Sequence, residues 1–545
     1  MPGSRSTEPD SVLAVLSDTP SPTIHRWTRR PQRIVSFIPS FGSFFGVQLV
    51  PDSHAIEQLP KLAWGRDDEL VLDFGIHMVG FLSFRLSCVD RVMDAPCRLR
   101  LTFGESPLDV TMDMEGVETW ISKAWLPDEV INVDMCPEDV TIRRRHAFRF
   151  LRIQVIDTSS AFKVAFSNVS CECVSAVSQD HKLDDIVFDD PLLQHIDRVC
   201  VMTLRDCIQS VFEDGPRRDR RMWIGDLRLQ ALANYATLRD LPLVRRCMLQ
   251  FAAVAREDGS LPACLYEKPD LHSGEVYLAD YDALFASIVY DYVVESGDLE
   301  TGALLWPTVL SCLSRPMKSL NPKTFLFEPG RTTDVKFLDW EKTVDKTAGS
   351  HGVVAFSLKA AQKLADLLSV PFPHEEAIKK MDESAKSFLE NDIFVSGSAK
   401  QISYASASWL VLAEVFPKDV ARAALLSTLK HPEAVKPLTP YLWHYMCDAL
   451  VSVGCHDECL EIIRTYWGGM VKAGADTFWE CYDPENSRAS PYGDVRTNSF
   501  CHAWSCTPTL LLRGSLMASA KGRRRGTITM GEVDEAWLGR TEDDL

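Results

Sequence analysis

The spacing of apolar residues changes near residue 190 of this 545-residue chain. From 61 to 178 the apolar residues come in short alternating runs broken by Gly, Pro and Asp, as in RHAFRFLRIQV at 145–155. Alternation of this kind is typical of half-buried strands. From 190 to 515 they recur three and four residues apart, which places them on one face of a helix. The chain therefore has to separate a β-rich part from a helical part.

The helical part contains about twelve amphipathic segments, found by counting apolar positions at helical spacing. They cover residues 191–212, 226–239, 241–256, 281–297, 303–314, 349–369, 374–390, 403–415, 418–430, 440–453, 457–472 and 500–513. About twelve helices make about six hairpins, and an (α/α)6 toroid at 190–515 is their economical arrangement. An α-solenoid is the alternative, but the segments show no fixed-period sequence repeat to support it.

The remaining sequence divides into shorter regions. Several short strands separated by turns predict an antiparallel β-sandwich at 61–178. Residues 1–24 are rich in Ser, Thr, Pro and Asp and are expected to form a flexible tail. Residues 25–60 mix Pro and Gly with aromatics and have no assignable fold. Residues 521–545 are expected to form a second tail.

Composition excludes several classes of function. The formal charge is 58 − 76 = −18, whereas binding to nucleic acid or to an anionic membrane surface needs a basic footprint. No run approaches the ~20 apolar residues of a transmembrane helix, and the N-terminus lacks the pattern of a secretory signal. The sixteen cysteines are scattered, which fits reduced thiols in a cytoplasmic protein and no zinc site. A monomer and a homo-oligomer both stay open.

Loops between the predicted helices concentrate acidic and aromatic residues. The densest loop, 212–226, holds Asp214, Asp219, Asp226 and Trp223. Others lie at 337–341, 475–483 and 498–504. Sugar sites combine such residues, because an indole face stacks on sugar C–H groups while two carboxyl groups perform acid and base work. The alternative is a surface ion-pair network with tryptophans in the core.

The segment DGPRRDRRMWIGD at 214–226 resembles the signature of glycoside hydrolase family 78, the α-L-rhamnosidases, whose motif reads approximately Asp-Cys-Pro-Gln-Arg-Glu-Arg-Leu-Gly-Trp-x-Gly-Asp. Four further segments resemble parts of the same family and follow in the same order. They are RHAFRFLRI at 145–153, FLDW at 337–340, GADTFWE at 474–480 and FCHAW at 500–504. The resemblance spans about 65–510 and implies a β-sandwich followed by an (α/α)6 barrel.

The resemblance also implies site residues for an inverting hydrolase of small rhamnosides. The general acid falls on Asp219 and the general base on Glu480. Asp214 and Asp226 match acids that bind rhamnose hydroxyls. The rest of the pocket would be made by Arg218, Trp223, Asp339, Trp340, Trp479 and His502. No cofactor is required, and no oxygen cage for a metal ion is apparent.

This chain departs from the family motif at the acid. Asp219 replaces a Glu, so its carboxyl reaches about 1.5 Å less far, one carbon–carbon bond. Arg221 and Met222 replace Leu and Gly, and the Arg221 cation favours the ionised form of a neighbouring acid. Two other hypotheses therefore stay open: a repurposed barrel that binds a small molecule or catalyses a different acid-assisted reaction, and a platform for protein interactions. Lys342 and Lys346 fit either ligand contact or the surface.

Overall fold

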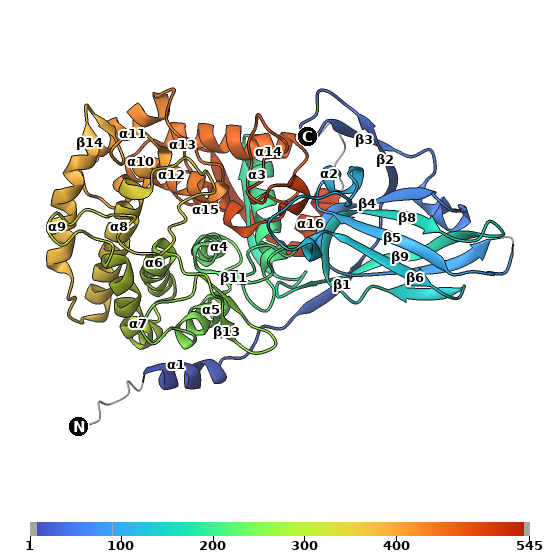
Figure 1. Cartoon of the computed structure of the whole chain (residues 1–545), viewed down its shortest axis with the longest axis horizontal. Helices are drawn as coiled ribbons and strands as arrows, with labels where there is room; N and C mark the ends of the chain where they lie inside the picture. Colours follow the sequence, from blue (N-terminus) through green and yellow to red (C-terminus); the bar gives the residue numbers. More distant parts are fainter. Residues whose placement is uncertain (1–7, 90, 539–545) are drawn as a thin grey trace.

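The structure is a computed structural model that describes residues 8–89 and 91–538. An antiparallel sheet domain and a helical domain lie side by side, with the strands at the right and the helices at the left of Figure 1. Helix α3 (Pro191–Cys207) is the first helix of the helical domain. The expected separation of β-rich and helical parts is therefore confirmed.

Hydrogen bonds join nine strands of the sheet domain, all in antiparallel pairs, into one sheet. The strands are β1 (His25–Arg29), β2 (Arg33–Pro39), β3 (Val47–Pro51), β4 (Glu69–Val89), β5 (Cys97–Gly104), β6 (Asp128–Val133), β7 (Glu138–Thr141), β8 (His146–Asp157) and β9 (Lys163–Ser175). The sheet domain is antiparallel as predicted, and the long β4 serves two sets of strands: its first half pairs with β2 and β8, and its second half pairs with β7 and β9. The segment 25–60 supplies β1 to β3.

Strand β4 changes direction at Gly75, where φ is +79° and the register with β8 shifts between Asp73 and Met78. Glycine adopts this left-handed conformation without a steric penalty. Large apolar side chains from β4, β5, β8 and β9 fill the core of the domain, among them Phe74, Phe103 and Phe148. The bend lets one strand contribute to the whole core.

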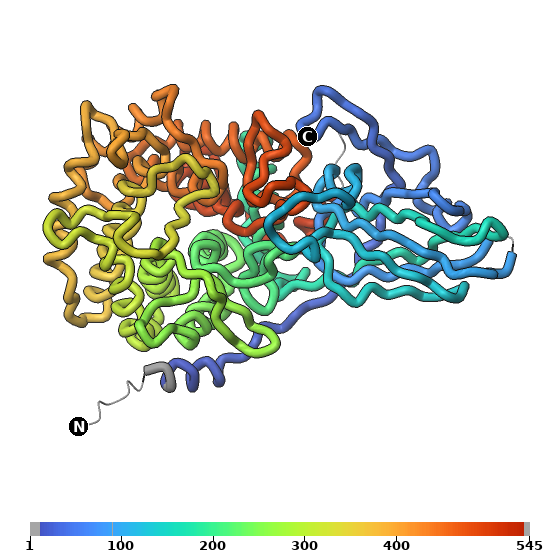
Figure 2. The backbone as a smooth tube through the Cα atoms, in the orientation of Figure 1, coloured from blue at the N-terminus to red at the C-terminus, as the bar shows by residue number. Residues whose placement is uncertain are grey.

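The helical domain follows the predicted periodicity except at 500–513, where a short 3-10 helix and a short α-helix replace the single predicted helix. Its elements are α3, α4 (Ile224–Ala236), α5 (Leu241–Ala253), α6 (Ala279–Ser296), α7 (Leu299–Met317), α8 (Lys346–Leu368), α9 (Glu375–Ala385), α10 (Tyr404–Leu412), α11 (Lys418–Lys430), α12 (Pro440–Ser452), α13 (His456–Ile462), η4 (Ile463–Trp467), α14 (Gly468–Lys472), η6 (Ala503–Ser505) and α15 (Pro508–Arg513). Helices α4, α6, α8, α10 and α12 contact one another in succession, and η6 contacts both α12 and α4. Figure 2 shows the backbone of this succession around the domain.

The prediction of a flexible tail at 1–24 is wrong for the residues that the structure describes. Helix α1 (Glu8–Ser17) packs on α5, and Val12 is buried there. Arg246 donates to the Thr19 carbonyl at 3.0 Å. Residues 1–7 lie outside the described residues. A short helix within a polar segment is hard to predict from its own sequence, because its stability comes from packing against the rest of the fold.

The prediction of a tail at 521–545 is also wrong as far as residue 538. Strand β16 (Gly522–Thr529) pairs with β10 (Lys182–Phe188), and α16 (Met530–Leu538) covers the junction of the two domains. Asp534 forms an ion pair with Arg29 at 2.9 Å and another with Arg205. Both partners of Asp534 lie more than 300 residues away in the sequence, so no local pattern predicts these ion pairs. Residues 539–545 lie outside the described residues.

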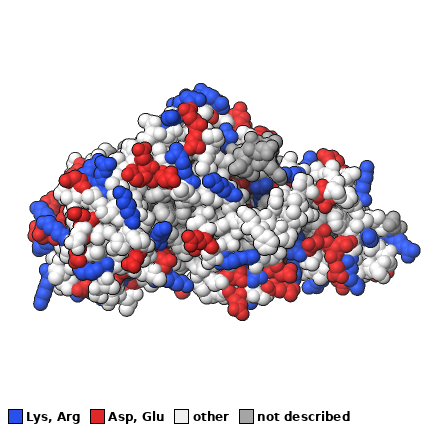
Figure 3. All heavy atoms as spheres, turned by 90° about the horizontal axis from the view of Figure 1, so that it is seen from above, with Lys and Arg blue, Asp and Glu red and all other residues white. Residues whose placement is uncertain are grey.

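Acidic and basic side chains are interspersed on the face shown in Figure 3. In residues 8–89 and 91–538, no helix is long and apolar enough to cross a membrane. All sixteen cysteines are free thiols.

Candidate active site

Nine of the ten predicted site residues line one cavity of about 380 Å³ in the helical domain. They are Asp214, Arg218, Asp219, Trp223, Asp226, Asp339, Trp340, Glu480 and His502. These residues come from the loop before α4, the loop before α8 and the two segments after α14. The fold thus brings four separated segments to one place.

Trp479 is the exception, and its prediction as a pocket residue is wrong. Its side chain is 4% exposed and packs among Phe44, Phe45, Tyr482 and Phe500. It lies outside the cavity lining, whereas the carboxylate of the next residue, Glu480, belongs to that lining. Trp479 therefore anchors the Glu480 segment in an aromatic cluster shared with the segment 25–60.

Asp214 organises the loop that carries the predicted acid. Its carboxylate accepts hydrogen bonds from the backbone N–H groups of Asp219 at 3.1 Å and Arg221 at 3.2 Å. Burial, with the nearby charge of Asp219 added, raises the pKa of Asp214 to about 7. Asp214 consequently holds the loop in a turn and still presents a face to the cavity.

Arg218 lies between the two predicted catalytic carboxylates. Its guanidinium contacts Asp219 Oδ1 at 3.3 Å and Glu480 Oε2 at 2.5 Å. The same guanidinium stacks on the Tyr492 ring at 4.0 Å from the ring centre. A single buried cation thus fixes the relative positions of Asp219 and Glu480.

Glu480 is held in its ionised form. Burial opposes ionisation, but the charges of Arg218 and His502 and a hydrogen bond from the Tyr492 hydroxyl outweigh it, so the pKa lies below its usual range. The backbone N–H of Ser499 adds a third donor at 3.3 Å. A carboxylate with such donors and almost no exposed surface suits the role of a base that activates one enclosed water.

Asp219 has a different environment. Its side chain is 18% exposed, against 2% for Glu480. Arg218 lies on one side of its carboxylate, and Arg221 lies at 3.9 Å on the other. The two carboxylates of the cavity therefore differ in their access to solvent.

Three further predicted residues are tied into hydrogen bonds. His502 Nε2 lies 3.1 Å from Asp226 Oδ1, in the first turn of α4, and the pKa of His502 is raised because Asp226 and Glu480 outweigh burial. Burial raises the pKa of Asp339 to about 6. Asp339 accepts backbone hydrogen bonds from Leu438 at 2.7 Å and Thr439 at 3.1 Å, which fixes the loop that presents Trp340.

Several lining residues were missed from the sequence. They are Trp120, Val276, Leu278, Tyr281, Val335, Lys336 and Tyr492. Phe337, Glu341 and Trp504 also line the cavity and lie in loops that the sequence had indicated, and Lys342 and Lys346 line it too. Trp120 belongs to the sheet domain; its indole N–H donates to the Pro491 carbonyl at 3.0 Å, and its ring lies 5.5 Å from that of Tyr492. No local pattern marks Trp120, because its role depends on the packing of one domain against the other.

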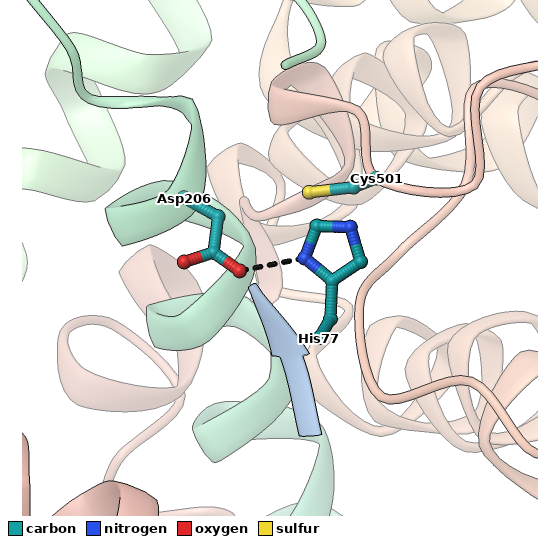
Figure 4. A group of neighbouring side chains, drawn as sticks. All are labelled: His77, Asp206 and Cys501. Atoms are coloured by element: carbon teal, nitrogen blue, oxygen red, sulfur yellow. Dashed lines mark hydrogen bonds and ion pairs between the residues drawn. The ribbon is translucent and has the colours of Figure 1, made fainter. Parts of the chain in front are cut away.

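One group of described residues has the composition of a metal site. Atoms of His77, Asp206 and Cys501 lie within 4.8 Å of one another, and Figure 4 shows His77 pointing toward Asp206 beside the Cys501 sulfur. His77 Nδ1 lies 2.7 Å from Asp206, and Nε2 lies 3.3 Å from Glu105. Although burial alone would lower it, Cys501 and these two bonds raise the pKa of His77. Both ring nitrogens of His77 thus lie within hydrogen-bond distance of a carboxylate, that of Asp206 or that of Glu105.

Each of the two domains matches the model of a known protein family. Residues 31–173 match the model of the glycosyl hydrolase family 78 α-rhamnosidase N-terminal domain, and residues 185–514 match that of the bacterial α-L-rhamnosidase 6 hairpin glycosidase domain. A search of curated proteins finds no match.

Solved structures agree with these models. A rhamnosidase from Klebsiella oxytoca with rhamnose bound is 34% identical with a TM-score of 0.87, over 92% of this chain and 98% of that one. A family 78 rhamnosidase from Bacillus sp. GL1 is 19% identical with a TM-score of 0.70, over 87% of this chain and 51% of that one. A Streptomyces avermitilis α-L-rhamnosidase complexed with L-rhamnose is 16% identical with a TM-score of 0.65, over 91% of this chain and 44% of that one. The last two show likeness of fold alone.

Proposed function

Because this chain belongs to glycosyl hydrolase family 78, the α-L-rhamnosidases, and is a glycosidase, we propose that it releases terminal α-L-rhamnosyl groups from small glycosides with inversion. Asp219 would be the general acid and Glu480 the general base. The observation that carries the proposal is the pair itself: two carboxylates, one partly exposed and one fully buried, bridged by Arg218 in one cavity. The similar Klebsiella oxytoca enzyme has rhamnose bound.

The two carboxylates suit different halves of the reaction. An inverting hydrolase needs a base that is already ionised and an acid that donates its proton to the leaving oxygen. Glu480, buried beneath three hydrogen-bond donors, supplies the first. Asp219, at the more exposed side, supplies the second and can take up a new proton from solvent after product leaves. The backbone N–H of Asp219 is held by the Asp214 carboxylate, which fixes the position from which the shorter side chain has to reach the leaving oxygen.

The remaining lining residues fit recognition of one sugar. Trp223 and Trp340 offer aromatic faces, and the Asp226–His502 pair offers both an acceptor and a donor for ring hydroxyls. The successive contacts from α4 to α12, with η6 between the ends, support an (α/α)6 toroid whose loops supply this pocket.

The rim of the cavity indicates where the leaving group lies. Three of its residues are exposed apolar side chains: Trp120 at 67%, Val276 at 44% and Val335 at 59%. They come from different loops, so their clustering is a property of the fold. An exposed indole and two exposed valines at this rim offer an apolar contact for the leaving group of a glycoside.

Proton NMR during hydrolysis tests the proposal. The enzyme is mixed with p-nitrophenyl α-L-rhamnoside, and the anomeric signal of the first rhamnose released is recorded before mutarotation. The proposal expects the β anomer to appear first. Initial release of the α anomer would contradict inversion, and the absence of hydrolysis of any α-L-rhamnoside would contradict the substrate.

A further inference from the structure

A second cavity, of about 440 Å³, lies between the two domains and shares a wall with the active site. The wall is the loop before α4. Asp214, Asp219 and Trp223 line the active site, whereas Arg220 and Arg221 line the second cavity. We call the second cavity the arginine cavity, because Arg145, Arg220 and Arg221 form its charged interior.

The arginine cavity is strongly positive in an acidic protein. It is lined by five cationic side chains and two carboxylates, while the whole chain carries a formal charge of −18. The cations are Arg26, Arg145, Arg220, Arg221 and Lys268, and the carboxylates are Glu213 and Glu267. The positive charge is therefore a local feature of this cavity and not of the surface as a whole.

Both carboxylates of the cavity are already paired. Glu213 receives two hydrogen bonds from Arg145, at 2.7 and 2.9 Å. Glu267 binds Arg246, which is outside the lining, at 2.8 Å. Neither carboxylate forms an ion pair with Arg220 or Arg221, although the charge of Glu213 favours the charged form of Arg220.

Arg220 is the least satisfied of these cations. Its Nε donates to the Arg217 carbonyl at 3.1 Å, and among the residues that the structure describes it has no ion-pair partner. Burial, with the like charges of Arg145 and Arg144 added, lowers the pKa of Arg220 to about 10. Arg221 is better placed: its Nε lies 3.9 Å from Asp219, and its guanidinium stacks 4.6 Å from the centre of the Tyr266 ring, although that Nε has no hydrogen-bond partner.

Arg220 thus faces the cavity without an ion-pair partner among the described residues, and a compensating negative charge stabilises a largely buried cation. Guanidinium N–H groups match the geometry of carboxylate and phosphate oxygens. Apolar side chains complete the lining, among them Phe81, Val211 and Leu265. We propose that the arginine cavity binds a small oxyanion, a phosphate or the carboxylate of a small organic acid, between Arg145, Arg220 and Arg221.

Calorimetric titration of the full chain tests this site without reference to catalysis. Inorganic phosphate and benzoate are titrated separately, with total ionic strength held constant by sodium chloride. We expect saturable binding of one anion per chain for at least one probe. Tighter phosphate would identify a phosphate site, whereas tighter benzoate would identify a carboxylate site that also uses the apolar wall.

Substitutions locate the binding. Arg220→Gln should raise the dissociation constant about tenfold or more, because it removes a charge-assisted hydrogen-bond donor. Arg221→Gln, at a side chain that is 20% exposed, serves as a second variant if Arg220→Gln fails to fold. Arg98→Gln removes the same charge from an exposed position on β5 outside the cavity and should bind like the parent chain. Saturable binding of neither anion, or equal binding by the parent, Arg220→Gln and Arg221→Gln, would overturn the proposal.

Discussion

Replacing Tyr492 with Phe removes one hydroxyl from the active site and leaves the ring in place. That hydroxyl donates to Glu480 Oε1, while the ring supports the Arg218 guanidinium and contacts Trp340. A hydrogen bond to a charged acceptor contributes about 1.5–3 kcal/mol. Because Tyr492→Phe keeps Arg218 on the other carboxylate oxygen, the lower figure is the appropriate one. The ionised form of Glu480 is then weakened relative to its protonated form by about 1.5 kcal/mol.

The sign of the effect on catalysis follows from the role of Glu480. A base acts only when ionised, and donors hold its pKa below the usual range in the parent enzyme. Since about 1.4 kcal/mol corresponds to one pH unit, the acidic limb of the kcat/KM profile should move to higher pH by about one pH unit. Activity on p-nitrophenyl α-L-rhamnoside should fall about tenfold on that limb and little at the plateau.

Tyr482→Phe is the matched control. Tyr482 lies two residues from Glu480 but belongs to the buried aromatic cluster with Trp479 and Phe44, outside the cavity lining. Its profile should coincide with that of the parent enzyme. An unmoved acidic limb in Tyr492→Phe, with the plateau intact, would refute the assignment of Glu480 as the base.

Three other substitutions test separate parts of the structure. Trp479→Ala should lower the free energy of unfolding in urea by about 3–5 kcal/mol, because Trp479 is a core residue. A raised KM with an unchanged free energy of unfolding would mean that Trp479 contacts the substrate instead. Asp534→Asn weakens the ion pairs with the buried Arg205 and with Arg29, so urea unfolding should show a loss of about 3 kcal/mol; an unchanged midpoint would mean that α16 is dispensable. Trp120→Ala should raise the KM for phenyl α-L-rhamnoside several-fold and leave the KM for methyl α-L-rhamnoside unchanged. Equal effects on the two KM values would mean that Trp120 does not contact the leaving group.

The sequence predicted correctly those elements whose local pattern of residues is enough to determine their structure. Helical spacing located the helices from α3 to α14, because each buries an apolar stripe against its neighbours. The motif at 214–226 brought its acids and Trp223 to one cavity, because a short loop before a helix cannot place them far apart. The family resemblance is confirmed, and with it the activity of a glycosidase, which leaves the platform hypothesis without support.

The failures share a cause in long-range contacts. Trp479 and Glu480 are neighbours in sequence, but only the packing against Phe44 and Phe45 decides which of them faces the cavity. Trp120 and Tyr492 meet across the domain junction. Strand β16 is mostly exposed and depends on β10 for its pairing, so its sequence resembles that of a tail. None of these contacts leaves a periodic trace in the sequence.

The leaving-group dependence of two amide variants tests the central claim that Asp219 donates the proton and Glu480 activates water. General acid and base roles each contribute about 10²–10⁴-fold, so Asp219→Asn and Glu480→Gln should both lose about that much kcat on methyl α-L-rhamnoside. On p-nitrophenyl α-L-rhamnoside, whose leaving group needs little protonation, Asp219→Asn should recover much of its activity while Glu480→Gln should not. Equal losses on both substrates for Asp219→Asn would contradict its assignment as the acid.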